Sequence, residues 1–260
     1  MNNSIHPTAL ISGKATLGKG NTIGAFVVIE DDVVVGDNNT LLSSVVLKSG
    51  TRLGNENTLH EQAVIGGLPQ DLGFNPATLS FVEIGDQNTI REFVTIHRAS
   101  QENSATRIGY NNYLMAQVHL GHDVVLGNNV IIAPSTGLGG HVRVEDRAFI
   151  SGGVMVHQFV HIGSFAMLGG NAKITQDALP FMITDGNPAR VSGLNKVGLR
   201  RAGFKLDDMK ELKKAYHILF NNELALDERL NRLSVLDDKN VKHLVSFIQA
   251  SKRGFHRDKA

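Results

Sequence analysis

An aliphatic residue recurs every six positions through most of the chain, and this period limits the possible folds more than any other feature. Counted in sixes from Ile5 to Ile65, from Ile84 to Ile96 and from Ile108 to Ile174, every position is Ile, Leu or Val. A period of six matches neither the 3.6-residue turn of a helix nor the two-residue alternation of a strand. It is typical of a parallel β-helix, in which short strands meet at tight corners and the aliphatic residue points into a narrow core.

Three hexads would close one coil of 18 residues, so residues 18 apart should stack at the strand spacing of about 4.8 Å. Gly or Asn often follows the aliphatic residue, and we expect it to accept the positive φ that corners demand. The frame breaks at residues 67–83 and 98–107, and loops that leave a solenoid often lie on one functional face. The sequence therefore predicts a β-helix over residues 1–183 with two external loops.

The hexads stop after Pro180, and residues 184–260 carry helical signals instead. Asp208 with Glu211 is typical of a capping box at the start of a helix. We predict a C-terminal domain of three helices, the second near residues 224–236, joined to the β-helix by an irregular segment over residues 184–204. The apolar residues at helical spacing are Met209, Leu212, Tyr216, Leu219, Phe220, Val241, Leu244, Val245 and Ile248.

Composition excludes several classes of function. The formal charge is +1, which gives no long-range field for nucleic acid. The chain has no Cys, which rules out disulfides, thiolate metal sites and a cysteine nucleophile. The first residues are polar and no run of about 18 apolar residues occurs, so we expect a cytoplasmic protein without an integral membrane segment.

The 18-residue period collects polar residues in one place. It stacks His122, Gly140 and Gln158 in one column across three coils, within about 10 Å along the axis. A solenoid does not need such a cluster, so we predict that the column is functional. The neighbouring polar residues are His119, Asp123, His141 and His157.

Two chemistries can use this cluster. Histidines could bind zinc, as in the β-helix carbonic anhydrases, or one neutral His could act as general base for acyl transfer with a backbone N–H as oxyanion donor. Spacing weighs against zinc, because those hydratases take two ligands from a His-x-x-x-x-His stretch that this chain lacks. A purely structural solenoid should carry a regular external ladder; we find no Thr ladder, and such a rod would not need the loop at residues 67–83.

Several motifs closely resemble the UDP-N-acetylglucosamine O-acyltransferase family from Ile5 to Phe255. They are "H-L-G-H-D", "G-G-H-V", "V-H-Q-F", "Q-D-L", "I-R-E-F-V-T-I-H-R" and "G-L-N-K-V-G-L-R-R-A-G-F". The resemblance implies a left-handed β-helix and a homotrimer with clefts between subunits. It also implies the first step of lipid A synthesis, in which a (3R)-3-hydroxyacyl chain moves from acyl carrier protein to position 3 of UDP-N-acetylglucosamine. The 4′-phosphopantetheine arrives on the donor, and no other cofactor and no metal is expected.

The resemblance also assigns roles to residues. His122 matches the catalytic base, Asp123 the carboxylate that orients it, and Gly140 the oxyanion donor. Asp71 and His141 match sugar contacts, while Asn195 and Arg201 match contacts to uridine and phosphate. Arg200 and Arg201 could instead meet the acidic carrier protein. The full set of expected substrate-binding residues is Gln70, Asp71, His119, His141, His157, Gln158, Asn195 and Arg201.

Gly170 matches the residue that closes or opens the acyl groove, which predicts a preference for about 14 carbons; Met167 or Lys173 could reach the groove instead. Two positions depart from the family's common pattern: Gly73, where Lys is frequent, and Pro188, where His is frequent. They leave open the detail of nucleotide binding. They also leave open whether the acceptor is the 3-hydroxyl or the 3-amine of an amino-sugar analogue.

Overall fold

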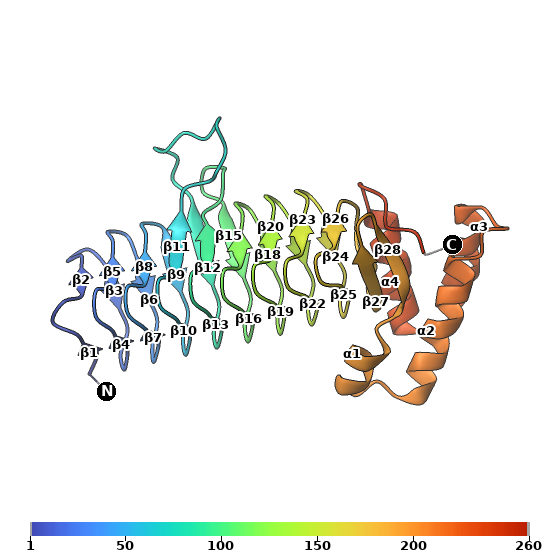
Figure 1. The fold of residues 1–260 in the computed structure, drawn as a ribbon, viewed down its shortest axis with the longest axis horizontal. Coiled ribbons are helices and arrows are strands. Elements are labelled where there is room, and N and C mark those ends of the chain that lie inside the picture. The colour runs from blue at the N-terminus through green and yellow to red at the C-terminus, as the bar shows by residue number, and fades with distance from the viewer. Residues whose placement is uncertain (1, 259–260) are drawn as a thin grey trace.

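A computed structural model describes residues 2–258 as a long stack of three-stranded coils closed at one end by helices (Figure 1). Strand partners are 18 residues apart in regular coils, as in Thr22↔Thr40, which confirms the predicted period. The separation is 31 residues for Thr58↔Thr89 and 24 for Thr89↔Tyr113, because two coils carry the inserted loops. The fold is mainly β, as the sequence predicts.

The strands form three sheets, one on each side of the coil, which we name sheets A, B and C. Sheet A contains β1 (Ser4–Ile5), β4 (Thr22–Ile23), β7 (Thr40–Leu41), β10 (Thr58–Leu59), β13 (Thr89–Ile90), β16 (Tyr113–Leu114), β19 (Ile131–Ile132), β22 (Phe149–Ile150), β25 (Met167–Leu168), β27 (Met182–Gly186) and β28 (Ala189–Leu194). Sheet B contains β2 (Leu10–Ile11), β5 (Val28–Ile29), β8 (Val46–Leu47), β11 (Val64–Gly67), β14 (Thr95–His97), β17 (His119–Leu120), β20 (Gly137–Leu138), β23 (Met155–Val156) and β26 (Lys173–Ile174). Sheet C contains β3 (Thr16–Leu17), β6 (Val34–Val35), β9 (Thr51–Leu53), β12 (Phe81–Ile84), β15 (Ala105–Ile108), β18 (Val125–Leu126), β21 (Arg143–Val144) and β24 (His161–Ile162).

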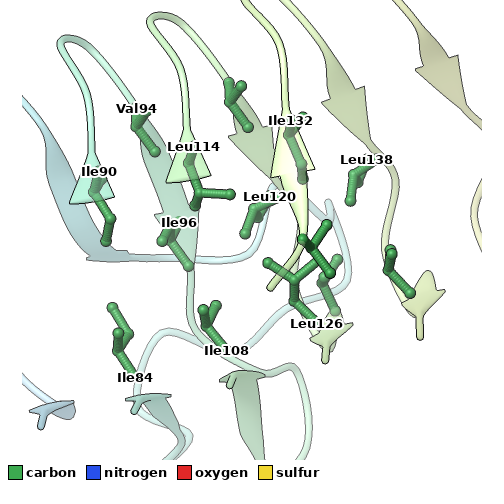
Figure 2. Close-up of a cluster of buried hydrophobic side chains, with 14 of the residues drawn as sticks. Ile84, Ile90, Val94, Ile96, Ile108, Leu114, Leu120, Leu126, Ile132 and Leu138 are labelled. Atoms are coloured by element: carbon green, nitrogen blue, oxygen red, sulfur yellow. The ribbon is translucent and has the colours of Figure 1, made fainter. Parts of the chain in front are cut away.

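The aliphatic hexad residues line the inside of the coils (Figure 2). Leu114, Leu120 and Ile132 are fully buried, and burial of each such side chain stabilises the fold by about 1.5–3 kcal/mol. Ile5 is the exception, with 46% of its surface exposed. It belongs to the first coil, which has no coil on its outer side, so the period alone does not guarantee burial there.

The glycines that follow the aliphatic residues serve a different purpose from the one expected. Positive φ falls on the third residue after the aliphatic one, for example Asp32 and Asn38, and not on the first. A Cβ at Gly36 would lie 2.6 Å from the carbonyl oxygen of Gly54 in the next coil. These glycines therefore permit close stacking of successive coils, and our assignment of positive φ to them was wrong.

A ladder of buried asparagines runs along the corner between sheets C and A. The side-chain oxygen of each accepts the backbone N–H of the next, as from Asn57 to Asn39 (2.8 Å). The side-chain amide donates to a glycine carbonyl, as from Asn39 to Gly54 (2.9 Å). This ladder satisfies backbone groups that the corner would otherwise bury unpaired. Its buried members are Asn21, Asn39, Asn57, Asn88 and Asn112.

The C-terminal segment is more regular than expected. An antiparallel hairpin, β27–β28, extends sheet A, and helix α1 (Lys196–Arg201) follows it, so the prediction of an irregular segment over 184–204 was wrong. Helices α2 (Leu206–Leu219), α3 (Leu226–Ser234) and α4 (Lys239–Ala250) confirm the three helices predicted from spacing. Asp208 lies in the first turn of α2 and accepts the N–H of Lys205 (2.9 Å), so it is not the cap residue we expected. No helix between residues 2 and 258 has both the length and the apolar character needed to cross a membrane.

Glu145 links the helical cap to the β-helix. Its carboxylate accepts hydrogen bonds from His243 of α4 (2.8 Å) and from the hydroxyl of Ser164 (2.6 Å), and it lies 3.0 Å from His161 Nε2. Burial alone would raise the pKa of Glu145, but hydrogen bonds from His161, His243 and Ser164 outweigh it and hold this pKa well below its usual range. The hydrogen bond to Glu145 raises the pKa of His243 despite burial.

We expect this link to weaken as pH rises. A His with a raised pKa stabilises the folded state fully below its unfolded pKa of about 6.5 and loses that contribution as pH rises through the folded pKa. Glu145, with a lowered pKa, contributes at all pH values above about 4.3. Urea unfolding should therefore show His243→Gln less stable than wild type by about 1 kcal/mol near pH 6. The difference should shrink toward pH 9, and a difference that grows with pH would contradict this assignment.

Candidate active site

The corner between sheets B and C carries the predicted polar column, and we call residues 121–123, 139–141 and 157–159 the polar corner. His122 lies between β17 and β18, Gly140 between β20 and β21, and Gln158 between β23 and β24. Because strands of successive coils pair in register, as in His119↔Gly137, these three corners stack along the axis. The structure thus brings together the residues that the 18-residue count selected.

His122 and Asp123 form a hydrogen-bonded pair. The His122 Nδ1 atom lies 2.7 Å from an oxygen of Asp123, which also accepts the backbone N–H of Ser100 (3.1 Å). Burial would raise the pKa of Asp123, but the hydrogen bonds from His122 and Ser100 outweigh it and lower this pKa. The carboxylate is therefore ionised at neutral pH and holds the proton of His122 on Nδ1. This leaves Nε2 with a lone pair, as a general base requires.

Gly140 lies directly against the His122 ring. A Cβ at this position would be 2.6 Å from both Cε1 and Nε2 of His122, so only glycine fits without displacing the imidazole. The Gly140 N–H donates to no acceptor among the residues described. Next to the basic nitrogen there is therefore a free backbone donor, which is the arrangement that stabilises a developing oxyanion.

The other predicted histidines differ in their surroundings. His141 Nε2 is 3.6 Å from Asp123, and its ring stacks on Phe159 at 4.6 Å with an interplanar angle of 4°. His119 Nδ1 is 2.8 Å from the hydroxyl of Thr95, and burial lowers the pKa of His119. His157 is exposed and lies beside the carbonyl of its neighbour Gln158, 3.0 Å from Nδ1 to the oxygen.

His97 belongs to this cluster, although its place in the sequence did not single it out. Its ring meets that of His119 edge to face at 4.9 Å. Burial, with the nearby His119 and His122, lowers the pKa of His97 to about 4, so it is neutral at physiological pH. The 18-residue count missed it because its coil has 24 residues. The signal that could have found it is the insertion length, which restores the register Thr95↔His119.

Three donor groups of the polar corner lie close enough to hold a metal ion. One ligand atom each from His122, Asp123 and His141 fall within 4.8 Å of one another. Two imidazoles and a carboxylate suit zinc. The expectation of metal-free chemistry therefore stays a prediction, to be tested directly.

The loop over residues 68–80 leaves the same corner between β11 and β12, and rises above the coils beside the shorter loop before β15 (Figure 1). It presents Gln70 and Asp71, of which Asp71 is exposed. The Asp71 side chain accepts the N–H of Gly73 (2.9 Å) and so forms a tight turn at the point where the family often has Lys. The predicted sugar contacts on this loop thus lie on the same edge as His122.

A groove of about 730 Å³ lies elsewhere, along sheet A and helix α1. It is lined by Met167, Asn195, Arg200 and Arg201, with apolar neighbours such as Phe149. The Asn195 amide caps α1 by accepting from Gly198 N (3.0 Å) and donates to the Phe165 carbonyl (2.9 Å). Both polar atoms of that side chain are thus used within the chain. In a single chain, Met167, Asn195 and Arg201 lie on a different face from His122.

Gly170 lies at a third place, the corner between sheets A and B. A Cβ there would meet only the carbonyl oxygen of Gly152, at 3.6 Å, which is an ordinary contact. The backbone of Gly170 does not need positive φ. Unlike Gly36 or Gly140, this glycine is not required by its surroundings.

Comparisons with known proteins agree with these features. A family model described as "Udp N-acetylglucosamine O-acyltransferase; Domain 2" matches residues 177–256, and one described as "Bacterial transferase hexapeptide (six repeats)" matches residues 105–140. An acyl-(acyl-carrier-protein)–UDP-N-acetylglucosamine O-acyltransferase from Gloeothece citriformis is 48% identical over 190 residues, 73% of this chain and 68% of the relative.

Solved structures match over nearly the whole chain. The UDP-N-acetylglucosamine acyltransferase of Bacteroides fragilis has 38% identity and a TM-score of 0.94, covering 97% of this chain and 100% of the other. The enzyme from Campylobacter jejuni has 35% identity and a TM-score of 0.93, covering 98% and 100%. The left-handed β-helix with C-terminal helices, expected from the sequence, is the fold of these structures. This chain belongs to the UDP-N-acetylglucosamine O-acyltransferase family.

Proposed function

We propose that the chain transfers a 3-hydroxyacyl group from acyl carrier protein to the 3-hydroxyl of UDP-N-acetylglucosamine, the first step of lipid A synthesis. The observation that carries this proposal is the His122–Asp123 pair stacked on the free N–H of Gly140. Curated relatives named for the same sugar nucleotide and carrier protein support it. A cytoplasmic location stays a prediction from the sequence.

The geometry supports a direct transfer. His122 Nε2 removes the proton of the sugar 3-hydroxyl as that oxygen attacks the thioester carbonyl, since the hydroxyl is too weak an acid to ionise alone. The carbonyl oxygen becomes an oxyanion near the Gly140 N–H. When the tetrahedral intermediate collapses, the C–S bond breaks and the His122 imidazolium returns the proton to the departing thiolate. No covalent enzyme intermediate forms, and the 4′-phosphopantetheine on the donor is the only group required besides the chain's own residues.

The direct test is an assay with UDP-N-acetylglucosamine, its 3-amino analogue and a set of 3-hydroxyacyl carrier proteins. We expect the ester product, full activity after treatment with a chelator, and no stoichiometric metal by elemental analysis. Acylation of the amino analogue alone would reverse the choice of acceptor. Stoichiometric zinc with activity lost to the chelator would favour a metal-dependent reaction such as that of the zinc hydratases.

We also propose that the active unit is a homotrimer with sites between subunits. The polar corner and the sheet A groove, which together hold the expected substrate contacts, lie on different faces of one chain. A neighbouring subunit can place its groove opposite the His122 of the first. Light scattering should give a trimer. Co-expressed His122→Ala and Arg201→Ala chains should recover part of the activity that each variant lacks alone, and a fully active monomer would contradict the proposal.

A further inference from the structure

A buried cation lies at the base of the loop over residues 68–80. Arg98 directly follows β14, has only 9% of its surface exposed, and donates its backbone N–H to the Gly67 carbonyl (2.9 Å). Within the described part of the chain it forms no ion pair with a carboxylate, and burial lowers the pKa of its guanidinium. Burying an uncompensated charge is costly, and a β-helix corner does not need one. Arg98 therefore calls for an explanation.

The contacts of Arg98 all lead to the loop. Its Nη2 donates to the Pro76 carbonyl (2.9 Å), and its guanidinium carbon lies 5.6 Å from the centre of the Phe74 ring. One planar group thus holds two points of the loop that are two residues apart, by a charge-assisted hydrogen bond and a cation–π contact. Its Nε is buried without a partner, so the side chain gains nothing from the coil itself.

Few other contacts hold the loop. Most of residues 68–79 are exposed, and one backbone hydrogen bond from Asn103 to the Leu79 carbonyl (2.8 Å) ties its end to the second loop. The turn that presents Asp71 closes with a hydrogen bond from Phe74 N to the Asp71 carbonyl (3.0 Å). Because Phe74 ends that turn and lies against Arg98, fixing Phe74 also fixes Asp71.

Arg98 connects the loop to the polar corner through its own neighbours in sequence. His97 packs on His119, and the backbone N–H of Ser100 reaches the Asp123 carboxylate. The short segment 97–100 therefore contacts the loop on one side and the His122–Asp123 pair on the other.

We infer that Arg98 is a positioning residue, which holds the loop over residues 68–80 in the conformation that admits the sugar nucleotide. The inference rests on the proposed function in taking this loop as a wall of the acceptor site. Arg98 touches no reacting atom; it acts through Phe74 and Pro76 on the placement of Gln70 and Asp71. Its removal should therefore affect acceptor binding much more than the chemical step.

The test is Arg98→Met, which keeps most of the side-chain length and removes the charge. Replacing an unpaired buried cation with an apolar residue should leave the β-helix at least as stable. Amide hydrogen exchange in residues 70–78 should accelerate by about tenfold or more. If the competent loop conformation falls to about a tenth of the population, the KM for UDP-N-acetylglucosamine should rise about tenfold. We expect kcat and the KM for the acyl donor to change by less than about threefold, because neither depends on that population once acceptor is saturating.

Three variants make the test specific. Arg107→Met removes an exposed arginine that pairs with Glu83 (2.9 Å) on the neighbouring strands, and it should alter neither loop exchange nor KM. Arg98→Lys keeps the charge but not the planar fork, and it should restore only part of the affinity. Phe74→Ala removes the loop's side of the contact without touching a coil, and it should raise the same KM even if Arg98→Met folds poorly.

Two results would overturn the inference. Unchanged loop exchange in Arg98→Met would show that Arg98 does not hold the loop. An unchanged acceptor KM with a loosened loop would show that the loop conformation does not govern acceptor binding. Failure of the proposed function is distinguishable, because a wild-type protein without transferase activity would still report, through loop exchange, whether Arg98 is the clamp.

Discussion

Replacing His122 with Ala should lower the turnover number by about 10² to 10⁴ while the β-helix stays folded. The ring is the only group beside the free Gly140 N–H that can accept the hydroxyl proton with its pair Asp123 already ionised. It lies outside the core, which consists of the aliphatic hexad residues. Loss of the imidazole therefore removes the base without leaving a cavity in the interior.

The measurement is steady-state kinetics with circular dichroism as a check on folding. His217→Ala is a suitable control, because His217 lies on α2 in the helical cap and outside the polar corner. It should keep wild-type turnover. Near wild-type turnover in a folded His122→Ala protein would remove His122 as the base, and the exposed His157 would then be the next candidate.

The coils could be predicted from the sequence because their cause is local. Each hexad states which residue enters the core, and the pairing of residues 18 apart follows from three hexads per coil. The same count is enough to place His122, Gly140 and Gln158 in one column. Spacing is sufficient wherever one repeat stacks on an identical one.

Features that depend on contacts between different coils were not predictable in this way. Gly36 and Gly140 are both corner glycines in the sequence, but one admits a neighbouring carbonyl and the other an imidazole. Nothing in the period shows which atom approaches. For the same reason, a 24-residue coil hid His97, and the irregular loop hid the role of Arg98.

Asn195 shows a limit of transferring roles by resemblance. The motif match selected it as a uridine contact, but its amide caps α1 and holds the Phe165 carbonyl. Its place in the sheet A groove still agrees with a contact near the nucleotide. A role for Asn195 would therefore come through the position of α1, which carries Arg200 and Arg201, as well as through any direct contact.

Gly170 is placed to measure the acyl chain across the face of sheet B. The corner between sheets A and B that precedes His119 in its own coil includes Ala116, and Gly170 occupies the same position three coils later, about 14 Å along the axis. The outward residues of sheet B between His119 and that level are Gly137 and Met155, which offer no charge to an acyl chain. An extended chain starting at the polar corner can thus cross an apolar strip before it reaches Gly170.

We expect the wild-type protein to prefer a 3-hydroxyacyl chain of about 14 carbons, and Gly170→Met to shift the preference to about 10. The new side chain has room, because its Cβ would meet only the Gly152 carbonyl at 3.6 Å and the backbone is unstrained. It would occupy the path of the last carbons instead of disturbing the coil. Four CH₂ groups at about 0.8 kcal/mol each are worth about 3 kcal/mol, which corresponds to roughly a 200-fold change in relative affinity.

Competition between carrier-bound chains of 10, 12 and 14 carbons in one reaction measures this shift directly. Gly13→Met is the matched control, because a Cβ at Gly13 meets nothing within 4 Å and the residue lies in the first coils, far from His122. It should leave the chain-length profile unchanged. An unchanged profile in Gly170→Met as well would move the ruler elsewhere. Met167 in the sheet A groove and Lys173 at the end of the sheet B strip would then be the residues to exchange, and the face on which the effect appears would show which side of the acyl chain each subunit covers.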